Sequence, residues 1–147
     1  MSLFFSTLAF LIGILLPIEV GVNLELARYI NSPVLAAFIS FLVGGFCLLA
    51  GAFAVKAPFP TWNQVVSLPG WTLTGGLIGA TVVFGSIVAG PKIGALVLVS
   101  LLLAGQLVAS ILIDHYGWLG FSVQKIDFQR LLGVVLLVGG FLLIRKY

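Results

Sequence analysis

The side chain best suited to chemistry in this sequence is the carboxylic acid Glu19, because residues 3–26 around it are otherwise almost wholly apolar. An ionisable group in the middle of a membrane span costs at least about 2.5–3.5 kcal/mol on insertion scales. A chain that keeps such a group is expected to use it, here as an acceptor of a proton or a cation. Asn23 follows four residues later on the same helical face, where its amide can orient a substrate. The alternative is a structural Glu19, satisfied by Asn23 or by Gln106.

Three further polar residues lie within apolar stretches and complete the candidate site. The amide of Gln106 must find hydrogen-bond partners near mid-membrane, and it can meet Glu19 across two helices to form a polar centre. Ser40 and Ser86 are weaker candidates. We predict that substrate or protons bind at Glu19, Asn23, Gln106, Ser40 and Ser86. The alternative for Gln106 is a hydrogen bond that only joins two helices.

No other group of residues in the sequence is suited to catalysis or metal binding. Asp114 and His115 are adjacent, but His115 is the sole histidine, which argues against a metal site and favours a cap at the membrane interface. Glu25 and Arg28, three residues apart, are predicted to form an interfacial ion pair of little energetic value. The sequence has no phosphate-binding loop and no serine-nucleophile motif. We therefore predict that the protein is not an enzyme and binds no cofactor and no metal.

The elements that position these residues must lie in lipid. Of the 147 residues, 61% are hydrophobic and only 7% are charged. About 25% of the residues of a soluble domain are charged, because they cover its surface. The apolar runs are continuous rather than alternating, which predicts transmembrane α-helices and excludes a transmembrane β-barrel. The basic residues form no cluster that could follow a nucleic-acid backbone, so no nucleic-acid partner is expected.

Five spans, each near the length of about 20 residues that crosses a bilayer, can be drawn in a single transmembrane domain of residues 1–147. The predicted spans are residues 3–29, 34–55, 70–89, 93–113 and 128–144. Pro17 is expected to kink the first span, because it removes a backbone hydrogen bond. The sequence Gly90-Pro91-Lys92 is expected to break the chain between the third and fourth spans.

Glycines recur within the spans at spacings that let helix backbones approach closely in lipid. Gly75 and Gly79 are four residues apart in the third span. Gly133, Gly139 and Gly140 give the short last span a smooth face, which is a candidate dimer contact. We predict that these five glycines are helix-packing positions.

Lysine and arginine are divided almost evenly between the two sides of the membrane. Three lie on the side of the N-terminus and four on the opposite side; these are Lys56, Lys125 and Arg130, against Arg28, Lys92, Arg145 and Lys146. The side with the excess of basic residues normally faces the cytoplasm, and a difference of one residue hardly determines the orientation of the chain. The chain therefore either inserts one way with a weak bias, or inserts both ways, or pairs with an oppositely oriented relative. Many secondary transporters are built from inverted repeats. Because this chain contains no internal repeat, an antiparallel dimer would have to supply the second copy.

Several segments of the sequence resemble one known family. They are GVNLEL at 21–26, NSPVLAAFISFLVG at 31–44, GPKIGA at 90–95, AGQLVASILIDHYG at 104–117, and LLGVV with GGF in the last span. Over essentially the whole chain, these segments resemble the YdcZ-like family of the drug/metabolite transporter superfamily. The resemblance implies a five-helix bacterial inner-membrane protein that corresponds to half of a ten-helix transporter. It also implies dual-topology assembly, from a single gene, an oppositely oriented pair or a fusion.

One position departs from the family pattern. Glutamine often stands in the family where this chain has Glu19, which indicates that this chain handles a cation, couples to protons, or pairs with a chain that carries the other residue. We therefore expect a subunit of a secondary transporter that moves a small cationic molecule and couples this movement to protons. The transporter is expected to be an antiparallel homodimer or a paralogous heterodimer. The expected partners are the substrate, the lipid bilayer and the second subunit. The alternatives are a passive channel and a non-transporting accessory or scaffold subunit.

Overall fold

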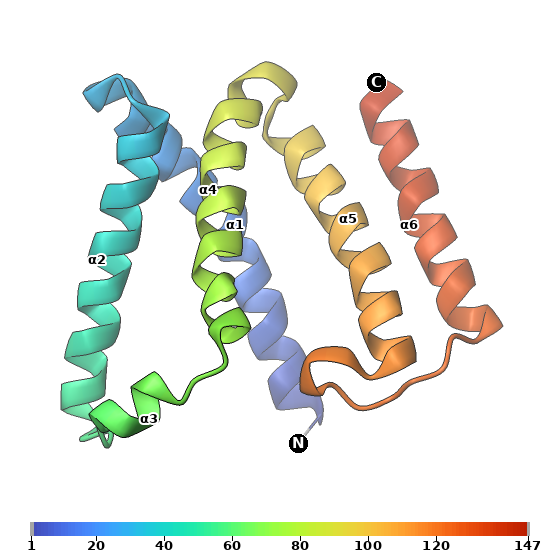
Figure 1. Ribbon diagram of the computed structural model, residues 1–147. Coiled ribbons are helices and arrows are strands. Elements are labelled where there is room, and N and C mark those ends of the chain that lie inside the picture. Colours follow the sequence, from blue (N-terminus) through green and yellow to red (C-terminus); the bar gives the residue numbers. More distant parts are fainter. Residues whose placement is uncertain (1, 147) are drawn as a thin grey trace. The chain divides into compact units, whose positions relative to one another are not determined.

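The computed structural model describes the backbone of residues 2–146 and the side chains of residues 3–144. The described chain is helical and contains no strand (Figure 1). In order, the elements are α1 (Ser2–Ile30), α2 (Pro33–Ala54), α3 (Trp62–Val66), η1 (Gly70–Leu73), α4 (Thr74–Ile93), α5 (Ala95–Tyr116), η2 (Trp118–Gly120) and α6 (Phe128–Lys146).

Four stretches of the described chain are long and apolar enough to cross a membrane. They are Leu3–Ile30, Pro33–Ala54, Gly70–Ile93 and Ala95–Tyr116. The fifth predicted span corresponds to the shorter apolar helix Phe128–Ile144. At 1.5 Å per residue this helix is roughly 25 Å long, slightly less than the bilayer core of about 30 Å. The all-helical membrane class is confirmed, whereas the number of five spans stays a prediction.

The connection between the third and fourth spans differs from the predicted one. The break was expected at Gly90-Pro91-Lys92, but α4 continues through Pro91 as far as Ile93. A proline in the last turn removes only one hydrogen bond, so the helix survives it. The chain leaves the helix at Gly94, whose φ of 81° lies in the region that favours glycine. Pro17 lies near the middle of α1, which continues as one helix from Ser2 to Ile30; the kink expected at this proline stays a prediction.

Two compact units make up the chain, and each is described by itself. Unit 1 extends to Lys92 and contains α1 to α4, and Unit 2 begins at Ile93 and contains α5 and α6. The assignment of the whole chain to a single transmembrane domain stays a prediction.

In Unit 1, α1 and α2 form a helical hairpin around the turn at Asn31, whose φ is 52°. The hydroxyl oxygen of Ser32 caps α2 by accepting a hydrogen bond from the backbone N–H of Leu35 at 3.3 Å. The core of Unit 1 is small: Ala27 of α1, Ala36 and Ala37 of α2, and Ile87 of α4. Alanines at this contact let the two helices of the hairpin approach closely.

In Unit 2, the segment between α5 and α6 is tied back onto the end of α5. The backbone N–H of Gln124 donates to the carbonyl oxygen of Asp114 at 2.8 Å. The backbone N–H of Ile126 donates to Nδ1 of His115 at 3.3 Å. Arg130, in the first turn of α6, donates to the side-chain oxygen of Gln124. These bonds hold the segment in place without any regular secondary structure over residues 121–127.

Candidate functional site

Glu19 lies close to the middle of α1 and is exposed in the single chain. The apolar stretch Leu3–Ile30 is 28 residues long, so Glu19 is about 4 Å along the axis from its centre. A carboxylate at this depth is far from the water on either side of a bilayer. No described side chain forms an ion pair with it, because the ion pairs of the described chain are at Arg28 and Arg130.

Asn23, one turn after Glu19, has the opposite environment. Only 4% of its surface is exposed, although it is polar. Residues four apart on a helix differ in direction by about 40°, and here this difference separates an exposed carboxylate from a buried amide. The two side chains therefore lie at the edge of the face that α1 buries in Unit 1.

The amide of Asn23 makes no hydrogen bond with any residue that the structure describes. Every fully enclosed side-chain nitrogen or oxygen in the described chain has a partner. The Asn23 amide is therefore not fully enclosed, and it retains a little open surface. An amide in this position has both a donor and an acceptor free to bond with a group from outside the described chain.

The two candidate serines of Unit 1 differ in how their hydroxyls are used. Ser86 of α4 is 4% exposed, and its hydroxyl donates to the carbonyl oxygen of Val82 at 2.7 Å. Ser40 of α2 is half-buried. It lies four residues after Ala36, as Asn23 lies four residues before Ala27. Because Ala27 and Ala36 belong to one contact of an antiparallel hairpin, Asn23 and Ser40 lie at the same depth in Unit 1.

Gln106 belongs to Unit 2, where it is exposed on α5. It lies within about 1 Å of the centre of that helix along its axis. In each unit an exposed polar side chain therefore lies near the middle of a long apolar helix: Glu19 in Unit 1 and Gln106 in Unit 2. The predicted meeting of Glu19 with Gln106 stays a prediction, since they belong to different units.

Two further pairs of polar or charged residues lie near the ends of helices. The predicted ion pair between Glu25 and Arg28 is confirmed, and both side chains are exposed, so it contributes little. Asp114 and His115 hold the segment that precedes α6 through the bonds described above. The described residues contain no group of three or more histidine, cysteine, aspartate or glutamate side chains that could hold a metal ion.

The predicted packing glycines have different surroundings. At Gly79 of α4 an added Cβ would lie 3.3 Å from Cζ of Phe41, so this glycine accommodates a ring from α2. At Gly75, Gly133, Gly139 and Gly140, no described atom apart from the nearby backbone of the same helix lies within 4 Å of a Cβ position. Their role in a dimer stays a prediction.

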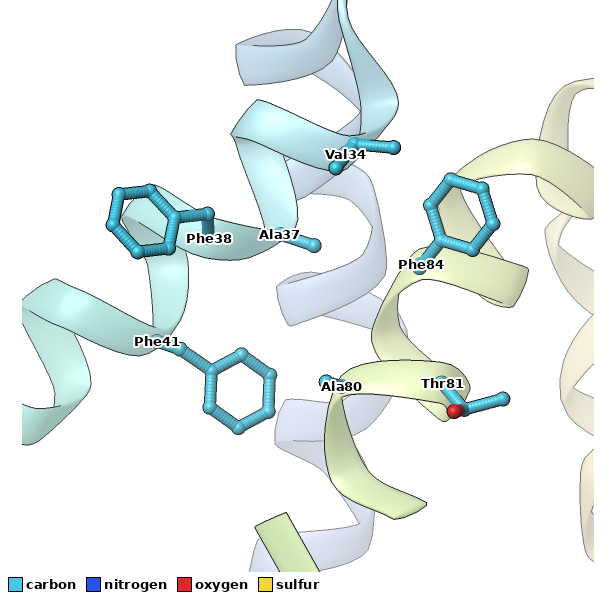
Figure 2. Close-up of a pocket in the computed structure, with 7 residues that line it drawn as sticks. All are labelled: Val34, Ala37, Phe38, Phe41, Ala80, Thr81 and Phe84. Carbon is cyan, nitrogen blue, oxygen red and sulfur yellow. The ribbon is translucent and has the colours of Figure 1, made fainter. Parts of the chain in front are cut away.

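Sequence reasoning missed a pocket between α2 and α4, and the pocket has a volume of about 520 Å³. Its lining is Val34, Ala37, Phe38, Phe41, Ala80, Thr81 and Phe84. Figure 2 shows the Phe41 ring pointing from α2 towards Ala80, with Phe84 on the α4 side. The signal in the sequence was the pair of phenylalanines three residues apart in the second span, but hydropathy alone does not distinguish such a pair from rings that face lipid.

Comparisons with known proteins agree with this architecture. A family model described as "Putative inner membrane exporter, YdcZ" matches residues 4–143. Over 143 residues, the chain is 29% identical to "Inner membrane protein YdcZ" of Escherichia coli (strain K12), and the match covers 95% of each protein. No solved structure matches the chain. The chain belongs to the YdcZ family, whose model description is that of an inner membrane exporter, and it is a multi-pass protein of the inner membrane.

Proposed function

We propose that this member of the YdcZ family is one subunit of a secondary transporter that exchanges a small cationic molecule for protons. The observation that carries the proposal is the exposure of Glu19 near the middle of α1. Asn23 supplies hydrogen bonds to the bound substrate from a position one turn away. In Unit 2, Gln106 is a further polar group at mid-helix depth.

An exposed carboxylate at this depth needs to be covered. Left against lipid tails it costs several kcal/mol, whereas a second copy can enclose it in a shared cavity. One half of an inverted-repeat transporter leaves its binding site uncovered in the same way, because the other half completes the site. The even division of basic residues between the two sides of the membrane supports an antiparallel dimer.

In the proposed mechanism, a proton and the substrate cation compete for the Glu19 carboxylate. The carboxylate holds one of them at a time, so release of the proton accompanies binding of the cation. Rocking of the two subunits around the site then exposes the carboxylate to alternate sides of the membrane. This scheme needs no bound cofactor.

The test of the site is proton exchange in vesicles that contain the purified protein. A panel of small organic ammonium ions is added outside, and a pH-sensitive dye inside reports proton movement. Glu19→Gln should abolish the exchange, because an amide cannot take up and release a proton. Glu25→Gln, which removes an exposed carboxylate at the end of the same helix, is the matched control and should retain it. An unchanged rate and pH dependence in Glu19→Gln would refute the proposed role of the acid.

The test of the assembly uses labelling from one side of the membrane. Cys47 is replaced by serine, and Ser67→Cys, which changes no charge, then supplies a single exposed thiol between the second and third predicted spans. In a dual-topology protein, a membrane-impermeant thiol reagent labels about half of the molecules in intact cells. Labelling of all molecules, or of none, would rule out the antiparallel homodimer.

A further inference from the structure

We propose that the pocket between α2 and α4 binds the flat aromatic part of the transported molecule, while its charged part lies at Glu19. This inference rests on the proposed function, and it adds the chemical class of the substrate: a small cation that carries an aromatic ring. The observations that carry it are the pocket's lining, its size and its depth in Unit 1.

The lining of the pocket suits a planar apolar group. Phenylalanine rings come from both helices, Phe38 and Phe41 from α2 and Phe84 from α4. Ala37 and Ala80 are the smallest residues of the lining. The one polar side chain, Thr81, donates its hydroxyl to the carbonyl of Leu77 at 2.9 Å, so the hydrogen is already used. Aromatic rings prefer stacked or edge-to-face contacts with another ring, which adds to the gain from burial alone.

The size of the pocket is that of a ligand site. A volume of about 520 Å³ lies within the range of roughly 300–1,000 Å³ that small-molecule pockets occupy. Gly79 helps to shape it, because an added Cβ there would lie 3.3 Å from Cζ of Phe41. The ring of Phe41 therefore rests against α4 where that helix has no side chain.

The pocket lies at the same depth as Asn23. Ala36 of α2 and Ile87 of α4 belong to one core cluster, and further along the two helices Phe41 of α2 and Gly79 of α4 are neighbours. Most of the pocket residues lie between these two levels; Phe41 lies at the second level, and Val34 lies beyond the first. On α1, the residue one turn from the same core cluster is Asn23, and the next turn carries Glu19. An aromatic group in the pocket therefore has a hydrogen-bonding amide at its own depth and a carboxylate one turn away.

This arrangement favours a ring over a lipid acyl chain. A flexible chain gains little from three rings in a hollow, because similar apolar contact is available along the outer faces of all the helices. A lipid tail also offers nothing to the Asn23 amide, which is 4% exposed and has no partner among the described residues. A ring that bears an ammonium group satisfies both features.

The experiment measures equilibrium binding of three probes to the purified full chain in nanodiscs. The probes are 1-naphthylmethylamine, the neutral 1-naphthalenemethanol, and n-octylamine as a cation without a ring. Phe41→Ala removes one wall of the pocket, and Ala80→Leu fills it. Because the two variants change the volume in opposite directions, a folding failure in one leaves the other as a test. Phe46→Ala is the matched control, since Phe46 lies on the same helix, is 66% exposed and does not line the pocket.

We expect both pocket variants to weaken binding of the two naphthyl probes by at least about threefold, in line with the worth of an aromatic pair. Octylamine should change less, and Phe46→Ala should bind as the unmodified protein does. Unchanged naphthyl binding in both pocket variants would overturn the inference. An equal loss of octylamine binding would also overturn it, because an acyl chain would then be the occupant. A third contrary result is naphthyl binding that disappears when two copies share a nanodisc, which would assign the pocket to the second copy.

The same probes separate this inference from the proposed function. If Glu19→Gln leaves amine binding unchanged while the pocket variants weaken it, the role of the acid fails and the pocket stands. If only Glu19→Gln weakens amine binding, the pocket fails and the acid stands. The neutral probe reports on the pocket alone, since it offers no charge to Glu19.

Discussion

Replacing Ala36 by leucine tests whether the α1–α2 hairpin is close-packed at its core. Ala36 has no exposed surface, and its neighbours Ala27 and Ala37 are 7% and 6% exposed. Leucine adds three carbon atoms at a site where no surface is open to receive them. Overpacking of this kind costs about 1–3 kcal/mol.

The cost translates into a melting shift that is easily measured. For a chain of this size, 1 kcal/mol lowers the melting temperature by roughly 2–4 °C, so Ala36→Leu should lower it by about 2–12 °C. Thermal unfolding of the purified protein in one detergent, followed by tryptophan fluorescence, measures the shift. Ala36→Ser, which adds a single oxygen atom, should be tolerated far better.

The matched control for this experiment is Ala50→Leu on the same helix. Ala50 is exposed on α2, and leucine is favourable against lipid. Its melting temperature should stay level or rise. If Ala36→Leu and Ala50→Leu melt at the same temperature, the hairpin is not close-packed at Ala36, and the depth assigned to Asn23 loses its support.

Two further predictions concern single side chains. Gly117→Ala should destabilise the end of α5, because the φ of 65° is unfavourable for alanine and the new Cβ would lie 2.6 Å from Cγ2 of Val123; the backbone term alone is about 1–2 kcal/mol. Gly120→Ala, with a φ of 86° and no atom near the new Cβ, should show only the destabilisation that comes from the backbone. In both variants, faster hydrogen exchange of the segment between α5 and α6 measures the loss of stability. Ser86→Ala should change stability by less than about 1 kcal/mol and leave proton exchange intact, because the Ser86 hydroxyl bonds within its own helix; a loss of exchange would place that hydroxyl in the substrate site.

Hydropathy predicted the membrane class and four of the spans well, because lipid requires long apolar helices with every backbone group bonded. The ends of the helices were harder to predict. Both Gly90-Pro91 and Gly94 are plausible breaks in the sequence, and only the backbone shows that the positive φ falls at Gly94. The short helix α3 carried a readable signal, since Thr61 and Gln64 form a capping box at its start.

The candidate site was predicted only in part, since burial depends on which face of a helix its neighbours cover. Glu19 and Asn23 are one turn apart, and the sequence alone does not reveal that one is exposed and the other buried. The pocket residues Phe41 and Phe84 are far apart in the sequence and come together only because α4 packs beside α2. The hydrophobic periodicity of a single sequence does not reveal which helices form contacts of this kind.

Gly94 has a consequence for any movement of the protein. It is the only residue between α4 and α5, so the two helices are joined without slack. A change in the tilt of either helix must be taken up by the two torsion angles of this residue, or transmitted along the backbone to the other helix. Valine is strongly unfavourable at the φ of 81° found there, so Gly94→Val would disturb the joint itself, and transport would then slow although no ligand-binding side chain had been removed.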